Sequence, residues 1–410
     1  MNEMDKALLA AARRGDVAAA AQALGGNGDG HWASANAIDV DGQSALCSAI
    51  SMGSQALVQL LLAHGANPNQ SRDGRKSAMV LAAQGSAEAS PGILGMLIDA
   101  GGDAKQKFIF NGASLLAEAA RAGQLRSMEL LIAKGASVHE VDAWGQTAVH
   151  AAATWAGPAE IGALAKASAP VDYPYAAKEA PGPRIPSRTM SPLALASSRG
   201  RIENVTALLD AGADPNAVGH GGRTALFAAA SSGSSAECER ALLRAGASAN
   251  HSDHSGATPL MAAAQAGKDA GVAELLLAGA DPMAKSAEGW SAIMFAAKHG
   301  MESCVALLVK EPFPEEADAR GESLAQLARA GGCSEKIIAM VARAVEMRFS
   351  ERAPQGRPFA GMSSLALSRS RTMLATGDRN NQKTSSAGKS VARLPKLARG
   401  AKLLGNRFPA

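Results

Sequence analysis

The sequence predicts an all-α repeat solenoid of helix-turn-helix units linked by β-hairpin-like tips, followed by a disordered basic C-terminal tail. A hydroxyl residue, a small residue or proline, and an apolar run recur in this order nine times along the chain. Hydrophobic residues make up 47% of the chain but aromatic residues only 3%, so the core must be built from small aliphatic side chains. Because 410 residues exceed the usual size of a single core, the fixed period favours a stack that grows in one dimension.

The repeated hydroxyl residue predicts the start of a first helix, because its side chain can accept a hydrogen bond from a backbone N–H one turn further on. Pro192 and Pro259 directly follow two of these residues, at the position where a helix best tolerates proline. The nine predicted caps are Ser44, Ser77, Ser114, Thr147, Ser191, Thr224, Thr258, Ser291 and Ser323. They are separated by 33, 37, 33, 44, 33, 34, 33 and 32 residues. These spacings indicate a repeat of constant length with two insertions.

Each repeat has room for two helices. A glycine nine residues after the cap in seven of the nine repeats predicts the end of a short first helix, since glycine readily adopts a positive φ. In six repeats a second apolar run ends in a Leu-Leu or Leu-Ile pair followed by glycine, which predicts a second, antiparallel helix. Pairs such as Asp41-Gly42 and Asn111-Gly112 precede the next caps and are typical of turns. We expect these turns to be the tips that link successive repeats.

Two repeats have the clearest family signature. Segments 222–226 (Gly-Arg-Thr-Ala-Leu) and 242–247 (Leu-Leu-Arg-Ala-Gly-Ala) belong to one repeat, and 256–260 (Gly-Ala-Thr-Pro-Leu) and 276–282 (Leu-Leu-Ala-Gly-Ala-Asp-Pro) to the next. With a helical half-repeat at residues 4–24, the chain resembles the ankyrin repeat family over residues 3–348. The histidine that the family usually has in Thr-Pro-Leu-His is present only at His150. The resemblance implies a solenoid that binds folded proteins on a concave face.

The sequence predicts five segments along the chain. They are an N-terminal half-repeat and loop at 1–38, repeats one to four at 39–169, a proline-rich inserted arm at 170–188, repeats five to nine at 189–348 and the basic tail at 349–410. Five prolines exclude a helix in the arm. The arm also holds the only tyrosines of the chain, Tyr173 and Tyr175, which either pack over the fourth repeat or form a recognition arm. The last repeat has a longer, charged second helix, as expected of a terminal cap.

The net charge of +4 hides an acidic body and a basic tail. From Ser350 onward the chain has 12 Lys or Arg and 2 acidic residues, whereas the preceding residues have 29 and 35. Arg393, Lys396, Arg399 and Lys402 recur every third residue between leucines, which predicts a basic amphipathic helix on contact with an acidic surface. The tail therefore suggests an alternative function, an electrostatic tether to nucleic acid or to an anionic membrane. A delivery or export signal is a further interpretation of the same tail.

Residue types with catalytic or metal-binding chemistry form no recognisable site, so we expect no enzyme, no cofactor and no metal. The four cysteines lack the spacing of a disulfide framework or a zinc site, which favours a reducing compartment. His251 and His254 lie beside Asp253, but they fall on a predicted tip and no further ligands converge on them. No signal peptide or membrane span is recognisable. We expect a cytoplasmic monomer, with export to another cell left open.

The resemblance also implies which residues face a partner. Ankyrin arrays vary at the two residues before the tip glycine, at the residue after it, and at the residues seven and eight beyond the cap. Around these positions the sequence has Phe110, Arg121, Trp144, Trp155, Arg188, Arg199, His220, Arg223, His254, Trp290, Lys298 and His299. Large aromatic residues and arginine anchor protein interfaces, although tip aromatics can also staple adjacent hairpins. We therefore expect a non-catalytic scaffold, as an adaptor or a delivered effector, that binds a partner protein on its concave surface.

Overall fold

The computed structural model describes residues 2–25, 32–70, 76–85, 90–108, 110–172, 190–232, 235–313 and 323–352. By its internal contacts the chain divides into two parts, Met1–Ser350 and Glu351–Ala410. The predicted arm from residue 173 onward, including Arg188, lies outside the described residues. So do the tail residues Arg393, Lys396, Arg399 and Lys402.

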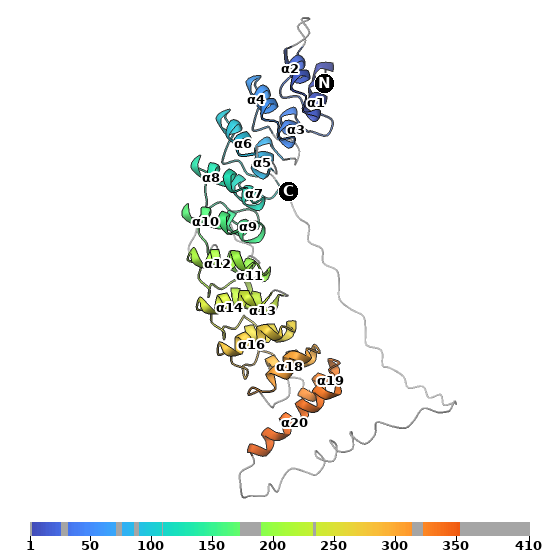
Figure 1. Ribbon diagram of the computed structural model, residues 1–410, viewed down its shortest axis with the longest axis vertical. Coiled ribbons are helices and arrows are strands. Elements are labelled where there is room, and N and C mark those ends of the chain that lie inside the picture. The colour runs from blue at the N-terminus through green and yellow to red at the C-terminus, as the bar shows by residue number, and fades with distance from the viewer. Residues whose placement is uncertain are drawn as a thin grey trace, which may run out of the picture. The chain divides into compact units, whose positions relative to one another are not determined.

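Helices follow one another in pairs through the first part (Figure 1). The first helices are α1 (Glu3–Arg14), α3 (Ala45–Ser51), α5 (Ala78–Gln84), α7 (Leu115–Arg121), α9 (Ala148–Trp155), α11 (Pro192–Ser198), α13 (Ala225–Ser231), α15 (Pro259–Ala266), α17 (Ala292–Lys298) and α19 (Leu324–Ala330). The second helices are α2 (Val17–Gly25), α4 (Gln55–Ala63), α6 (Ser90–Asp99), α8 (Leu125–Ala133), α10 (Pro158–Lys166), α12 (Ile202–Asp210), α14 (Ala236–Arg244), α16 (Asp269–Leu277), α18 (Glu302–Leu308) and α20 (Glu335–Arg352). We number the repeats from α3/α4 (repeat 1) to α19/α20 (repeat 9).

The prediction of an all-α solenoid is confirmed. Within the described residues β-structure is limited to two isolated antiparallel bridges, Ile38 with Ser44 and Lys107 with Ser114, which close the tips of repeats 1 and 3. The tip of repeat 6 instead forms a short 3-10 turn, η1 (His220–Gly222). The tips are therefore tight turns rather than strands of a sheet.

Helix capping explains where the first helices begin. In seven of the nine repeats the Ser or Thr side-chain oxygen accepts a hydrogen bond from the backbone N–H three residues later, at 3.1–3.4 Å. Thr147 differs, because its backbone N–H and its hydroxyl both contact Nδ1 of His150, at 3.0 and 2.9 Å. The hydroxyl of Ser291 is buried and makes no hydrogen bond to the described residues.

The helices form two layers. Each first helix packs against the first helices of the neighbouring repeats, and from α2 to α18 each second helix packs against the neighbouring second helices. In Figure 1 the even-numbered and odd-numbered helices accordingly form two adjacent columns. The stack continues from repeat 4 to repeat 5, because α9 contacts α11 and α10 contacts α12. The inserted arm therefore does not separate the repeats on either side.

Alanine lets the first helices approach one another closely. The fifth residue after every cap is an alanine with no exposed surface: Ala49, Ala82, Ala119, Ala152, Ala196, Ala229, Ala263, Ala296 and Ala328. Leucines of the second helices, such as Leu61, Leu131 and Leu208, fill the space between the layers and are equally buried. This packing explains how a core with few aromatic residues can be continuous.

Side-chain amides link the loops that follow the second helices. Four asparagine side chains each donate to the carbonyl of a glycine in the next repeat, at 2.9–3.0 Å. Each also accepts from the backbone N–H two residues beyond that glycine. These residues are Asn36, Asn69, Asn216 and Asn250. For three of these residues the sequence carries a signal, because Asn69, Asn216 and Asn250 lie four residues after Gly65, Gly212 and Gly246, which follow second helices.

Repeat 4 departs from the pattern at the end of its second helix. Ser168 has a φ of 60°, whereas the corresponding Gly135 and Gly212 of the neighbouring repeats have φ values of 83° and 88°. A residue with a Cβ is strained in this left-handed region. Repeat 4 therefore carries a local strain that its neighbours avoid.

Candidate protein-binding surface

The tip surface consists of the hairpin tips and of the residues seven and eight beyond each cap. Of the twelve residues that the sequence analysis assigned to it, all except Arg188 are described, and nine of these are exposed. The exposed residues are Phe110, Trp144, Trp155, Arg199, His220, Arg223, His254, Lys298 and His299. Arg121 is partly buried, and Trp290 is buried. Their role in binding stays a prediction.

Repeats 1–4 expose large apolar side chains on the tip surface. Phe110 is 69% exposed, and Trp144 and Trp155 are each 54% exposed. Val40 and Met52 are also exposed, and the sequence analysis missed both. The positional rule would have found them, because Val40 lies two residues before Gly42 and Met52 eight residues beyond Ser44. Five apolar residues thus occupy positions where ankyrin arrays meet partners.

Phe110 lies over a pocket that spans the tips of repeats 1–3. Its ring meets Phe108 edge-on, with the centroids 5.3 Å apart and the planes at 67°. The pocket has a volume of about 360 Å³. Its lining consists of Gly42, Gln43, Cys47, Lys76, Leu81, Phe108 and Phe110. The surface of repeats 1–3 is therefore both apolar and concave at this point.

The tip that carries Trp144 is held in place by hydrogen bonds. The carboxylate of Asp142 accepts from the backbone N–H groups of Trp144 and Gln146, at 2.9 and 2.8 Å. The backbone N–H of Ala143 donates to the carbonyl of Asn111 in the preceding tip, at 2.7 Å. Burial raises the pKa of Asp142, and these backbone hydrogen bonds oppose it. Trp144 is therefore presented on a tip whose backbone is already ordered.

The side chain of Arg121 is partly buried beside Glu118. Its Nε lies 3.7 Å from Oε1 of Glu118, a residue with only 2% exposure. The side chain of Gln84 also donates to the Glu118 carboxylate. Arg121 thus helps to compensate a buried acid, and we assign it a supporting role.

Trp155 and Arg199 join the tip surfaces of repeats 4 and 5. The guanidinium carbon of Arg199 lies 4.9 Å from the centre of the Trp155 ring, within the range of a cation–π interaction. Trp155 is the last residue of α9, Arg199 directly follows α11, and both are exposed. The exposed surface is therefore continuous across the insertion point.

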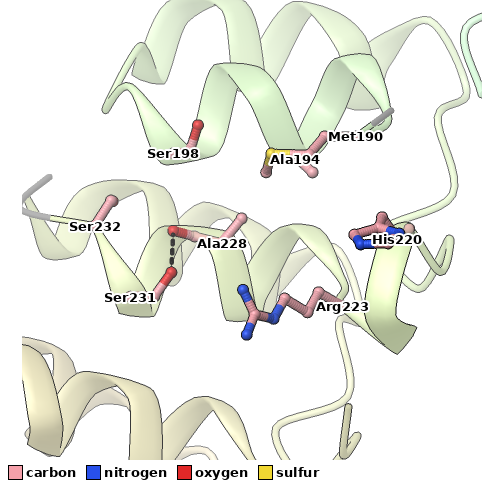
Figure 2. A pocket seen from close by; sticks show the side chains of 9 residues that line it. Met190, Ala194, Ser198, His220, Arg223, Ala228, Ser231 and Ser232 are labelled. Atoms are coloured by element: carbon pink, nitrogen blue, oxygen red, sulfur yellow. Dashed lines mark hydrogen bonds between the residues drawn. The ribbon is translucent and has the colours of Figure 1, made fainter. Parts of the chain in front are cut away.

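A second pocket lies between the first helices of repeats 5 and 6 (Figure 2). Its volume is about 340 Å³. It is lined by Met190, Ala194, Ser198, Gly219, His220, Arg223, Ala228, Ser231 and Ser232. In Figure 2 the three serines lie toward one end, and His220 and Arg223 toward the other. The pocket thus includes two of the residues assigned to the tip surface from the sequence.

Arg223 is held in place by two neighbours. Its Nε donates to Oδ2 of Asp253 at 3.2 Å, and its guanidinium carbon lies 4.9 Å from the centre of the Phe227 ring. Burial pushes up the pKa of Asp253, but hydrogen bonds from Ser255, the backbone and Arg223 outweigh it and leave the pKa below its usual value. Asp253 is therefore a carboxylate, and the arginine side chain, 58% exposed, remains oriented.

The expectation that Trp290 is an exposed anchor is wrong. Only 5% of the residue is exposed, its ring centroid lies 5.4 Å from that of Phe295, and Nζ of Lys298 lies 4.4 Å above the ring. Trp290 follows the tip glycine and directly precedes the cap Ser291, and from that position its ring packs against the helix that follows. Trp290 and the stem of Lys298 are thus structural parts of repeat 8.

In the histidine cluster of repeat 7, His251 and Asp253 interact with other residues of the protein. Nε2 of His251 lies 3.1 Å from the carbonyl oxygen of Gly222, and Asp253 binds Arg223 and its own turn. Within the described residues no group of three or more His, Cys, Asp and Glu side chains could hold a metal. The four cysteines are buried as free thiols, and burial raises the pKa of Cys238 and Cys304 to about 11.

Family comparisons agree with this geometry. A model of three ankyrin repeat copies matches residues 116–219 and 193–286, and a single ankyrin repeat model matches residues 41–73. The chain is therefore an ankyrin repeat protein. A comparison with curated proteins found no match. Among the described helices, none is long and apolar enough to cross a membrane.

Proposed function

We propose that this protein is a non-catalytic scaffold that binds a partner protein on its tip surface. Ankyrin repeats are generally protein-interaction modules and typically lack catalytic activity. The observation that carries the proposal is the exposure of Phe110, Trp144 and Trp155 on ordered tips and helix ends. Large aromatic residues are among the residue types that dominate binding energy at protein interfaces.

The chain offers a matched control for testing this proposal. Leu277 is 85% exposed at the end of α16, in the layer of second helices. Trp144→Ala and Phe110→Ala remove apolar surface from the tips, whereas Leu277→Ala removes it from the other layer. We expect each tip variant to weaken partner binding by more than about 2 kcal/mol and Leu277→Ala to change it little. The measurement is affinity capture with the intact protein, followed by titration of the recovered partner.

The tail provides the alternative function and a separate outcome. If the protein is mainly an electrostatic tether, deletion of residues 353–410 abolishes capture, and the tip variants behave like the parent. Full retention of the partner by both tip variants would exclude the tip surface. The roles of an adaptor and of a delivered effector are both compatible with this surface, and with a protein that acts as a monomer.

A further inference from the structure

The charge on the tip surface is unevenly distributed. In repeats 5–8 its described residues include the cations Arg199, Arg223 and Lys298, the histidines His220, His254 and His299, and the exposed acid Glu288. Yet residues 1–349 as a whole contain 35 acidic residues against 29 Lys and Arg. Many acids of repeats 5–8 lie instead on the second helices, such as Glu203, Glu237 and Asp269. This part of the tip surface therefore suits an acidic partner. The basic tail of the same chain does not suit this surface as a ligand, because both are positively charged.

The pocket between α11 and α13 lies within this cationic region. Its walls are apolar at Met190, Ala194 and Ala228, and His220 and Arg223 lie toward one end (Figure 2). At about 340 Å³ it is small among ligand pockets, so it suits one large side chain rather than a folded element. An apolar wall beside a cationic group is the arrangement that would hold an apolar side chain next to a carboxylate.

Arg223 is prepared for a further carboxylate. Asp253 and Phe227 fix the guanidinium through Nε and one face, and no described residue hydrogen-bonds to its two Nη atoms. A guanidinium binds carboxylates in a planar, paired geometry, and a preoriented one loses little freedom when it does so. His220, also exposed, makes no hydrogen bond to the described residues and lies at the same end of the pocket.

We propose that this pocket receives a large apolar side chain from an acidic segment of the partner protein, and that Arg223 and His220 bind a neighbouring carboxylate of that segment. This inference rests on the proposed function and specifies the chemistry of the partner. The acidic segment then continues along the cationic positions of repeats 5–8.

The test uses a random peptide library displayed on phage and the full-length protein. Peptides selected by the parent should carry Asp or Glu beside Phe, Leu, Met or Trp. Ser231→Phe fills the pocket from an exposed position and should remove the preference for the apolar residue. Arg223→Ala and His220→Ala should each weaken binding of a selected peptide, the former about tenfold, and Arg223→Lys should restore part of it. Fluorescence anisotropy of the labelled peptide measures these affinities.

Arg126→Ala is the control, because Arg126 is exposed on α8 in the other layer. The tail is the same in every variant, so its own attraction for acidic peptides cancels in the comparison. Selected peptides without an excess of acids, or equal binding by the parent and Ser231→Phe, would overturn the inference. If Ser231→Phe lowers only the thermal midpoint and leaves selection unchanged, the pocket receives no side chain of the peptide, and the inference is also wrong. Loss of the partner on Trp144→Ala without any acidic preference would leave the proposed function intact and exclude this inference alone.

Discussion

Trp144 and Trp290 occupy neighbouring positions in the tips of repeats 4 and 8, yet 54% of the first residue is exposed and only 5% of the second. Trp144 precedes the tip glycine, whereas Trp290 follows it and packs on Phe295. The same contrast extends along the stack. Repeats 1–4 expose apolar residues on the tip surface, and repeats 5–8 expose Arg, His and Lys. One backbone template thus supports two kinds of exposed surface, and the side chain and its position in the tip decide which.

The largest expected effect is on the buried tryptophan. Trp290→Ala removes a buried ring from repeat 8, and we expect it to lower the free energy of unfolding by roughly 3 to 5 kcal/mol. The exposed Trp144 is the matched control, and Trp144→Ala should leave stability nearly unchanged. Denaturant unfolding followed by circular dichroism measures both. Equal losses of stability would remove the distinction between the two tips.

A comparable loss is expected at a buried ion pair that links repeats 6 and 7. Nζ of Lys268 lies 2.6 Å from Oε1 of Glu239, whose side chain has no exposed surface, and burial raises the pKa of Glu239 although Lys268 opposes it. Lys268→Met leaves this acid without its partner and should cost about 3 kcal/mol of stability. The more exposed pair of Arg240 with Glu274 serves as the comparison, because Arg240→Met should cost much less stability. Thermal melts of the two variants measure this difference in stability. Similar midpoints would contradict the prediction.

A pH effect should arise in repeats 1–4. His150 is fully buried, and burial lowers its pKa to about 4, an effect that the Met190 backbone partly opposes. Since the unfolded chain takes up this proton at a higher pH than the folded one, stability is complete above the ordinary histidine pKa and falls as the pH drops toward about 4. We expect a loss of about 2 kcal/mol between about pH 7 and about pH 5.

The corresponding variant is His150→Gln. Its unfolding free energy should change less over the same pH interval than that of the parent, whatever its stability at neutral pH. If the stability of the parent protein does not change across this pH interval, the predicted effect of His150 is wrong.

The smallest effect on stability is expected from the tail. Deletion of residues 353–410 keeps α20, the long last helix, and should leave the thermal midpoint nearly unchanged. Binding of heparin or of acidic vesicles should weaken, most clearly at low salt, because the tail carries most of the excess positive charge. Titrations across a salt series measure this change. If the shortened chain binds these polyanions as well as the parent, the cationic residues of repeats 5–8 are responsible instead.

The fold was predictable because its signals are local. Seven of nine caps form the expected hydrogen bond, and glycines after the helices have the positive φ that their spacing implied. The surface was less predictable, since exposure depends on contacts between repeats. The burial of Trp290 depends on Phe295 and Lys298, and the orientation of Arg121 on a glutamate one turn away. The sequence also gave no sign that Ser198 and Ser231, from different repeats, would line one pocket.

The junction between repeats 4 and 5 has a consequence for how this chain can vary. The side chain of Asn204 donates to the carbonyl of Ala153 at 3.0 Å, and that of Arg201 to the carbonyls of Thr154 and Ala156, each at 2.9 Å. In these hydrogen bonds, side chains of repeat 5 satisfy backbone carbonyls at the end of α9. Neither the donors nor the acceptors belong to the residues between 172 and 190. The insertion point can therefore accept loops of different length and sequence, or a fused domain or label, while the repeats on both sides keep their register.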